Sequence, residues 1–289
     1  MVKKKIIIIG YGSIGKKHCK VLKNFNVDYY VISSQKNIKE KQVKYSDIKK
    51  IDPDYVLIAS PTSKHLKDLV TVDKLIKGKT ILIEKPLFHK KTKYFPKNNR
   101  VLVAYNMRFH PIIEYLKKLS KKNKIYNVEI LCGSYLPNWR KRNYIHSSSA
   151  KKILGGGVVN DLSHEIDYSR YIFGDLKKMF IYKDKVSNLQ INTEDYANIF
   201  CKSKKINIWI SLDYISKIER RSVKINFEKF TIEADLIKNK VFYYTNHLRK
   251  IVHFEKKNSY YEQMKNMLND KFKNFCTYEE GRQVLDIIH

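Results

Sequence analysis

The sequence predicts an α/β protein of two domains. The first is an N-terminal Rossmann domain with a doubly wound parallel sheet, and the second is a C-terminal α+β domain with a mostly antiparallel sheet. Over residues 1–107, short apolar runs alternate with helical stretches, as in a parallel sheet covered by helices. Over residues 108–289, many of the runs alternate apolar and polar residues, which is typical of antiparallel strands with one solvated face. A length of 289 residues with 43% hydrophobic residues fits two domains with cores of their own.

The elements of the first domain follow from its apolar runs. Residues 6–9 are four consecutive isoleucines, which is typical of a strand buried on both faces. A helix is expected from about 13 to 24, and Gly78 stands where a second helix should stop. The further strands are expected over residues 29–32, 54–59, 80–83 and 101–105, and the second helix over 63–77.

The second domain is expected to hold seven strands and three helices. Residues 224–227 show the alternation clearly, as Lys-Ile-Asn-Phe. One continuous helix over 158–173 interrupts the strands, and helical periodicity returns near the C-terminus. The expected strands cover 125–131, 178–183, 196–201, 206–213, 222–228, 230–234 and 240–244, and the other helices cover 260–268 and 278–288.

Charge and composition limit the partners. The formal net charge is +30, but lysines are spread along the whole chain rather than gathered in one stripe, so we expect no nucleic-acid partner. A basic nucleic-acid binder is kept as an alternative. No apolar run reaches about 18 residues, so we expect no membrane partner. Four scattered cysteines without metal-ligand spacing predict no metal and a reduced, cytoplasmic chain; they are Cys19, Cys132, Cys201 and Cys276.

The first chemical motif is a glycine turn. Gly10, Gly12 and Gly15 match G-x-G-x-x-G, with Ser13 and Ile14 inside it, directly after a predicted buried strand and at the start of a helix. Gly10 makes a tight turn, Gly12 lets a pyrophosphate approach the backbone, and Gly15 lets helix and strand pack closely. The free N–H groups at the helix start favour the phosphates. The motif predicts a dinucleotide site.

The end of the second strand bears on the choice of cofactor. A carboxylate there would bind the ribose 2′-hydroxyl of NAD. The sequence instead has Ser33, Ser34 and Lys36, which supply donors and positive charge for a 2′-phosphate. This pattern favours NADP, with NAD as the alternative and Lys36 as an ordinary surface lysine in that case.

Polar residues follow the other strands of the first domain. Because the carboxyl ends of parallel strands meet at one edge of a sheet, we expect these clusters to lie together at the cofactor. For His65 alone, a structural role is favoured over a catalytic one. The cofactor-binding candidates are Ser60, Pro61, Thr62 and His65 after the third strand, Glu84 and Lys85 after the fourth, and Asn106 after the fifth.

The second domain carries a candidate acid/base group. Glycines 155–157 precede Asn160, Asp161, His164 and Asp167. On one helix, Asp161 and Asp167 each lie three residues from His164, and Asn160 lies four residues from it, so all three share its face. A histidine near a carboxylate can take the proton of an alcohol close to neutral pH.

Taken together, these motifs resemble the glucose–fructose oxidoreductase / inositol dehydrogenase (Gfo/Idh/MocA) family of NAD(P)-dependent sugar oxidoreductases. The resemblance runs over nearly the whole chain and rests on the glycine turn, on Ala-Ser-Pro-Thr at 59–62, on Glu-Lys-Pro at 84–86, on residues 105–111, and on the Gly-Gly-Gly…Asp…His helix. It implies hydride transfer between a nicotinamide cofactor and a hydroxyl or keto carbon of a sugar or activated sugar. It also implies a homodimer or homotetramer formed through the sheet of the second domain.

The resemblance further implies roles for particular residues. Lys85 would contact the nicotinamide ribose and the substrate hydroxyl and lower the pKa of that hydroxyl. His164 would be the acid/base, and Asp161 would orient His164 or bind a substrate hydroxyl. The remaining candidates for the substrate side are Asn106, Arg108, Trp139, Arg140 and Asn160.

The chain also departs from the family pattern. Family members often place this Asp and His four residues apart, whereas Asp161 and His164 are three apart. Residues 87–100 are short and polar where the family commonly has a full helix. The Trp139-Arg140 pair together with Leu-Ser-His-Glu-Ile-Asp resembles a branch associated with bacterial surface sugars, including sialic-acid-like sugars.

Two alternatives stay open within the oxidoreductase scaffold. One is a reductase of a non-sugar carbonyl or imine, which needs only a hydride and a proton source. The other is a non-catalytic NADP-binding protein, although a chain that no longer catalyses could lose both Lys85 and His164.

Overall fold

The computed structural model describes residues 3–141 and 143–289, and these form two compact units. The first unit contains the chain up to Asn106 and also Ser259–Ile287, and the second contains Met107–Asn258. The sequence placed the domain boundary after residue 107, and the chain first passes from the first unit to the second between Asn106 and Met107. The C-terminal segment, predicted in the second domain, groups with the first unit instead, because it adds a strand and helices there.

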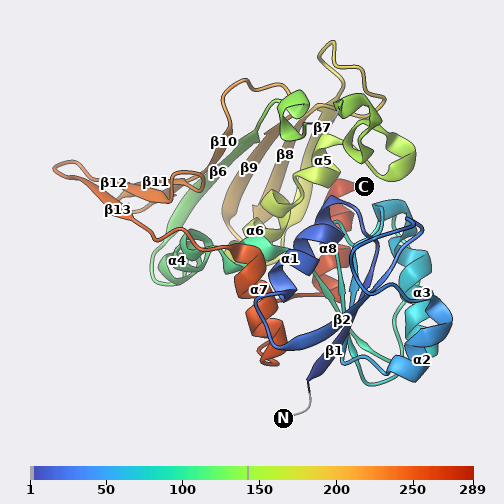
Figure 1. Ribbon diagram of the computed structural model, residues 1–289. Coiled ribbons are helices and arrows are strands. Elements are labelled where there is room, and N and C mark those ends of the chain that lie inside the picture. The colour runs from blue at the N-terminus through green and yellow to red at the C-terminus, as the bar shows by residue number, and fades with distance from the viewer. Residues whose placement is uncertain (1–2, 142) are drawn as a thin grey trace. The chain divides into compact units, whose positions relative to one another are not determined.

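The first unit is built on a doubly wound sheet, as predicted (Figure 1). Five of its strands are parallel, and the sixth, from the C-terminal segment, pairs antiparallel with β5. The strand order is β14-β5-β4-β3-β1-β2. From β1 the chain first adds β2 on one side and then adds β3, β4 and β5 on the other, so the strand order reverses at β1. Its strands are β1 (Lys4–Ile9), β2 (Val27–Ile32), β3 (Tyr55–Ile58), β4 (Thr80–Ile83), β5 (Arg100–Val103) and β14 (Cys276–Thr277).

The helices of the first unit are α1 (Ser13–Leu22), α2 (Ile48–Ile51), α3 (His65–Leu75), α7 (Ser259–Leu268) and α8 (Tyr278–Ile288). The sequence missed the short α2. No helix lies between β4 and β5, as the polar composition predicted. Asp73 on α3 holds that segment instead, because its carboxylate accepts hydrogen bonds from the Tyr94 hydroxyl, the Lys97 and Asn98 amides and the Asn99 side chain at 2.9–3.2 Å.

The strand register brings the ends of the parallel strands level. Ile9 pairs with Ile32 and Ile58, Ile58 pairs with Ile83, and Ile83 pairs with Val103. The residues that follow these strands therefore stand side by side along one edge. This confirms the expectation that the polar clusters after the strands share an edge, beside the point where the topology reverses.

The second unit is built on a sheet of the order β13-β12-β11-β10-β6-β9-β8-β7. Its neighbours pair antiparallel except for β6 and β9, which pair parallel at the centre. The predicted mostly antiparallel sheet is confirmed, and β13 is a strand that the sequence analysis missed. The strands are β6 (Ile125–Gly133), β7 (Lys177–Asp184), β8 (Tyr196–Ser203), β9 (Ile206–Asp213), β10 (Arg220–Phe227), β11 (Thr231–Asp235), β12 (Lys240–Tyr244) and β13 (Arg249–His253).

The helices of the second unit are α4 (Pro111–Ser120), α5 (Val158–Asp161) and α6 (His164–Phe173), and α5 and α6 cross β8 and β9 (Figure 1). The sequence missed α4. The predicted single helix over 158–173 is wrong, because Leu162 (φ −98°, ψ 27°) leaves the helical region and the Ser163 hydroxyl donates to the Asn160 carbonyl at 2.9 Å. Short 3-10 turns occupy Leu136–Trp139, Tyr144–His146, Ser148–Ala150 and Lys152–Leu154.

Candidate active site

Two glycines of the turn after β1 are required by packing. Gly10 has φ +103°, and a Cβ there would lie 2.6 Å from the backbone of Ala59 and Ser60. A Cβ on Gly15 would lie 2.1 Å from the Gly10 carbonyl oxygen. The turn therefore fits against β3 and against its own helix only with glycine at both positions.

Gly12 is different, because a Cβ on it would meet no atom within 4 Å. It precedes α1 with extended backbone (φ −74°, ψ −165°), and the first turn of α1, where Ser13 is exposed, has no acidic residue. The first N–H groups of a helix are unsatisfied within the helix and attract anions. Open space over Gly12 at such a helix start fits the pyrophosphate of a dinucleotide.

A second loop is tied to this turn by two glutamines that the sequence analysis did not single out. The Gln35 side chain donates to the Tyr11 carbonyl at 3.1 Å, and Gln42 donates to the carbonyls of Ser33 and Gln35 at 2.8 and 3.1 Å. The Ser33 hydroxyl accepts from the Gln35 amide at 3.0 Å. The loop after β2 is thus held beside the glycine turn, with Ser34 and Lys36 exposed on it.

The nearest acidic side chain after β2 is already engaged. The Glu40 carboxylate accepts from the Tyr29 hydroxyl at 2.5 Å and from Lys23 at 3.0 Å, and these bonds hold its pKa below the ordinary value although burial opposes the shift. No carboxylate directly follows β2 to bind a ribose hydroxyl.

The polar cluster after β3 is largely internal. The Ser60 hydroxyl donates to Asp68 at 2.6 Å, while Pro61 is exposed and Thr62 is half-buried. His65 is 1% exposed; its Nε2 lies 2.9 Å from the Ser60 carbonyl oxygen, and its Nδ1 lies 3.2 Å from the carbonyl oxygens of Pro86 and Leu87. Burial lowers the pKa of His65. This burial does not support a cofactor contact for His65 and fits the structural interpretation.

The cluster after β4 places a lysine at the same edge. Glu84 is buried, Lys85 is half-buried, and the peptide bond between Lys85 and Pro86 is cis. The Glu84 carboxylate lies 2.6 Å from Nε2 of His18, a residue of α1 that the sequence analysis did not single out. Asn106, after β5, is 6% exposed.

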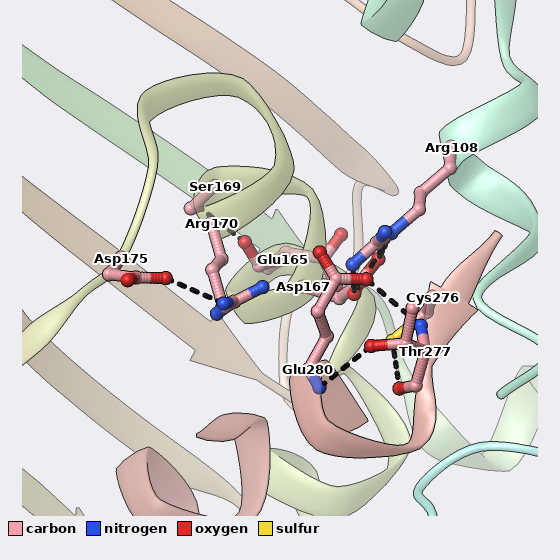
Figure 2. Close-up of polar contacts among 9 residues, drawn as sticks. All are labelled: Arg108, Glu165, Asp167, Ser169, Arg170, Asp175, Cys276, Thr277 and Glu280. Atoms are coloured by element: carbon pink, nitrogen blue, oxygen red, sulfur yellow. Dashed lines mark hydrogen bonds and ion pairs between the residues drawn. The ribbon is translucent and has the colours of Figure 1, made fainter. Parts of the chain in front are cut away.

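In the second unit, His164 is the first residue of α6 and is 8% exposed. Two ion pairs hold this helix, one buried and one half-buried. The Asp167 carboxylate accepts hydrogen bonds from Nε and Nη2 of Arg108 at 2.7–3.2 Å (Figure 2). The Glu165 carboxylate accepts a hydrogen bond from Nε of Arg221 at 2.8 Å. Loss of one partner of a buried ion pair is strongly destabilising, because the other charge is left uncompensated. Together they hold the position of His164.

Arg108, predicted on the substrate side, is engaged within the second unit. It is 1% exposed, pairs with Asp167, and its guanidinium lies 4.8 Å from the centre of the Tyr171 ring. This burial does not support a substrate contact. Asp167 was expected to share a helix face with His164. Its carboxylate instead accepts a hydrogen bond from Arg108, so it serves the same ion pair.

Asp161 ends α5, before the break, so the helical spacing expected between it and His164 does not apply. The Tyr214 hydroxyl donates to its carboxylate at 2.7 Å. Trp139 packs edge-on against Tyr214 with ring centres 5.2 Å apart, and its indole donates to Ser134 at 2.8 Å. Tyr214 therefore contacts both residues, Trp139 through its ring and Asp161 through its hydroxyl. Arg140 is exposed.

A further carboxyl lies at the start of α5. The Val158 amide donates to the Glu194 carbonyl at 3.1 Å, and a Cβ on Gly157 (φ +120°) would lie 2.4 Å from the Glu194 carboxylate. Burial raises the pKa of Glu194, and the charge of Asp161 raises it further. Asn160 donates to the Gly156 carbonyl at 3.3 Å, while its buried Oδ1 has no hydrogen-bond partner among the residues that the structure describes. The tight fit against Glu194 explains the glycine at 157, and no local pattern revealed this contact.

Within residues 3–141 and 143–289, no group of three or more His, Cys, Asp or Glu side chains could hold a metal ion. In the same residues, no helix has the length and apolar character needed to cross a membrane. The four cysteines are buried and free.

Comparison with known proteins identifies the first unit. Residues 4–94 match the oxidoreductase family Gfo/Idh/MocA, described as having an NAD-binding Rossmann fold. These residues belong to that family. The predicted family and the predicted dinucleotide-binding domain are confirmed.

A levoglucosan dehydrogenase of Pseudarthrobacter phenanthrenivorans is 30% identical to this chain over 134 residues, which cover 43% of the chain. The aligned part spans only 34% of that relative.

Solved structures resemble this chain over nearly its full length. The UDP-N-acetylglucosamine 3-dehydrogenase GnnA from Acidithiobacillus ferrooxidans has a TM-score of 0.78 at 16% identity, covering 99% of this chain and 95% of that one. The WlbA dehydrogenase from Bordetella pertussis, solved with NADH and UDP-GlcNAcA, has a TM-score of 0.76 at 16% identity, covering 99% of this chain and 94% of that one. At such identities the likeness establishes a common fold.

Proposed function

We propose that the protein is an NAD(P)-dependent oxidoreductase that transfers hydride between the nicotinamide and a hydroxyl or keto carbon of a sugar or activated sugar. The observation that carries the proposal is the glycine turn. Gly10 and Gly15 are required by packing, whereas Gly12 faces open space at a helix start. A glycine without a packing reason, at that point of a Gfo/Idh/MocA domain, is explained by a pyrophosphate that approaches its backbone.

In this proposal the residues of the chain hold the cofactor and handle the proton. The bound nicotinamide supplies or accepts the hydride. Lys85 contacts the substrate hydroxyl, and its ammonium stabilises negative charge that develops on that oxygen. His164 takes the hydroxyl proton during oxidation and returns it during reduction. Asp161, whose carboxylate accepts from Tyr214, binds a substrate hydroxyl or orients His164.

We infer NADP as the preferred cofactor, with NAD as the alternative. Support comes from the loop after β2, where Ser33, Ser34 and Lys36 follow the strand and the nearest acid, Glu40, is engaged by Tyr29 and Lys23. Hydroxyl groups and a lysine suit a 2′-phosphate better than a free 2′-hydroxyl. The relative WlbA was solved with NADH, so the two cofactors must be compared directly.

We infer that the substrate is an activated sugar of the kind used for bacterial surface sugars. Two structural relatives are named for, or bound to, UDP-linked amino sugars or their acids. In the second unit, Trp139 and Asp161 meet at Tyr214, which gives an aromatic face beside a carboxylate. Aromatic rings and carboxylates are suited to the apolar faces and the hydroxyls of a sugar.

We also propose that the protein assembles as a homodimer or homotetramer through the sheet of the second unit. Large apolar side chains stand exposed on the strands β7, β8 and β9, namely Met179, Phe180, Tyr182, Phe200 and Trp209. Clustered exposed apolar residues are typical of interfaces. The molar mass in solution, measured by light scattering, tests this proposal.

The experiment for the activity uses a panel of nucleotide-linked and free sugars with NADP⁺ or NAD⁺, read by the absorbance of the reduced nicotinamide. His164→Ala should lose about 10²–10⁴-fold in kcat, the usual contribution of a positioned histidine, and Lys85→Ala should also lose turnover. The exposed residues Lys90 and His146 give matched control variants. Near wild-type turnover of both site variants on the true substrate would overturn the assignment.

A further inference from the structure

The buried pair between α1 and the end of β4 has no part in the reaction described so far. His18 is 1% exposed and Glu84 is 7% exposed, and Nε2 of the one lies 2.6 Å from Oε1 of the other. The two residues are 66 positions apart in the sequence, so the contact exists only in the folded first unit. The Tyr260 ring of α7 packs edge-on against the His18 ring at 5.7 Å and covers it.

The same carboxylate continues to Lys85. Oε2 of Glu84 accepts from the Lys85 amide at 3.3 Å, a long contact, while Oε1 faces His18. On the other side, His65 engages the carbonyls of Pro86 and Leu87 at 3.2 Å. Residues 84–87 are therefore held by two buried histidines, with His18 at Glu84 and His65 at Pro86 and Leu87.

Packing alone does not explain a histidine at position 18. Nδ1 of His18 is buried and has no hydrogen-bond partner among the described residues. A buried polar atom without a partner costs about 1–3 kcal/mol. Apolar side chains at both positions 18 and 84 would avoid this cost and also that of burying the Glu84 carboxylate. The pair is explained if the geometry of the Glu84 carboxylate matters for the residue that follows it.

We propose that His18 is a positioning residue for Lys85, acting through Glu84. The proposal rests on the proposed function, in which Lys85 contacts the substrate hydroxyl. His18 fixes the Glu84 carboxylate, that carboxylate fixes the Lys85 backbone, and the direction of the lysine side chain follows. A misplacement of about 1 Å at a reacting group can lower the rate by about 10²-fold.

The test compares His18→Leu, which removes the hydrogen bond, with His18→Gln, whose amide nitrogen can reach the position of Nε2. For His18→Leu we expect kcat to fall about 10–100-fold, with little change in the Kd of the reduced dinucleotide. His18→Gln should restore kcat to within a few-fold of wild type. Glu84→Met, which keeps the length of the side chain and removes both hydrogen bonds, should resemble His18→Leu and provides the test if His18→Leu does not fold.

A double-mutant cycle separates positioning from general stability. Each variant is also made together with Lys85→Ala. If His18 acts through Lys85, then His18→Leu or Glu84→Met causes no further loss of kcat once Lys85 is gone. The same fold-loss in both backgrounds, or an unchanged kcat in the Lys85-containing protein, would overturn the proposal. Unchanged turnover of Lys85→Ala alone would instead overturn the role that the proposed function gives to Lys85.

Discussion

Replacing Gly12 by Ala separates ligand binding from folding. Gly12 has φ −74°, which alanine adopts readily, and the added methyl would meet no atom of the protein within 4 Å. Glycine is preferred over alanine before a helix, whereas the stiffer unfolded chain of the variant stabilises the fold by about 0.4–1 kcal/mol. These effects oppose each other, so the free energy of unfolding should change by less than about 1 kcal/mol.

The cost of Gly12→Ala should appear in the affinity for the dinucleotide. A methyl group forced into a close contact costs about 1–3 kcal/mol, which corresponds to a loss of about 5- to 150-fold in Kd. The assay is the fluorescence of the reduced nicotinamide during titration with NADPH, alongside chemical unfolding of the same preparation.

Gly78→Ala is the matched control for this measurement. Gly78 also has no atom within 4 Å of an added Cβ, but its φ is +72° and it lies before β4, away from the carboxyl ends of the strands. This variant should lose about 1–2 kcal/mol of stability and keep the wild-type Kd. Wild-type affinity in Gly12→Ala would refute the reasoning, because no phosphate would then approach Gly12.

Two further predictions concern the second unit. Asp167→Asn leaves the buried Arg108 guanidinium without its counter-charge and should lower the free energy of unfolding by about 3–5 kcal/mol in urea titrations; a loss below about 1 kcal/mol would contradict the buried pair. Burial lowers the pKa of His110 from 6.5 to about 4, so on acidification through this range the unfolded chain takes up a proton that the folded ring does not, and stability falls. The full effect is roughly 3 kcal/mol. His110→Asn can keep the cap on the Ile112 amide, which Nδ1 of His110 accepts at 3.2 Å, and should remove this part of the pH dependence; equal pH profiles of the two proteins would contradict the assignment.

The sequence predicted those features whose causes are local. Four consecutive isoleucines followed by the glycine turn identified β1 and the start of α1, because a buried parallel strand and a phosphate-binding turn each have a pattern of their own. The alternation over 222–228 identified β10 for the same reason.

Features that depend on distant partners were beyond local patterns. His18 and Glu84, or Arg108 and Asp167, meet across 66 and 59 positions, and nothing near either histidine or arginine indicates its carboxylate. The break between α5 and α6 was missed because Leu162 and Ser163 include neither proline nor glycine; a serine hydroxyl bonded to the backbone accompanies it.

The grouping of the C-terminal segment also depends on tertiary contacts. β14 has only two residues, too few for a pattern, and is defined by its pairing with β5. The position of Glu194 over Gly157 also depends on tertiary contacts, because it follows from the packing of β8 and the preceding loop against α5.

The most direct test of a nicotinamide-dependent enzyme is the titration of the wild-type protein with NADPH and, separately, with NADH, read by nicotinamide fluorescence. We predict saturable binding of one dinucleotide per chain, with NADPH bound more tightly than NADH. Tighter binding of NADH would reverse the choice of cofactor drawn from Ser33, Ser34 and Lys36. Binding of neither dinucleotide would contradict the central claim.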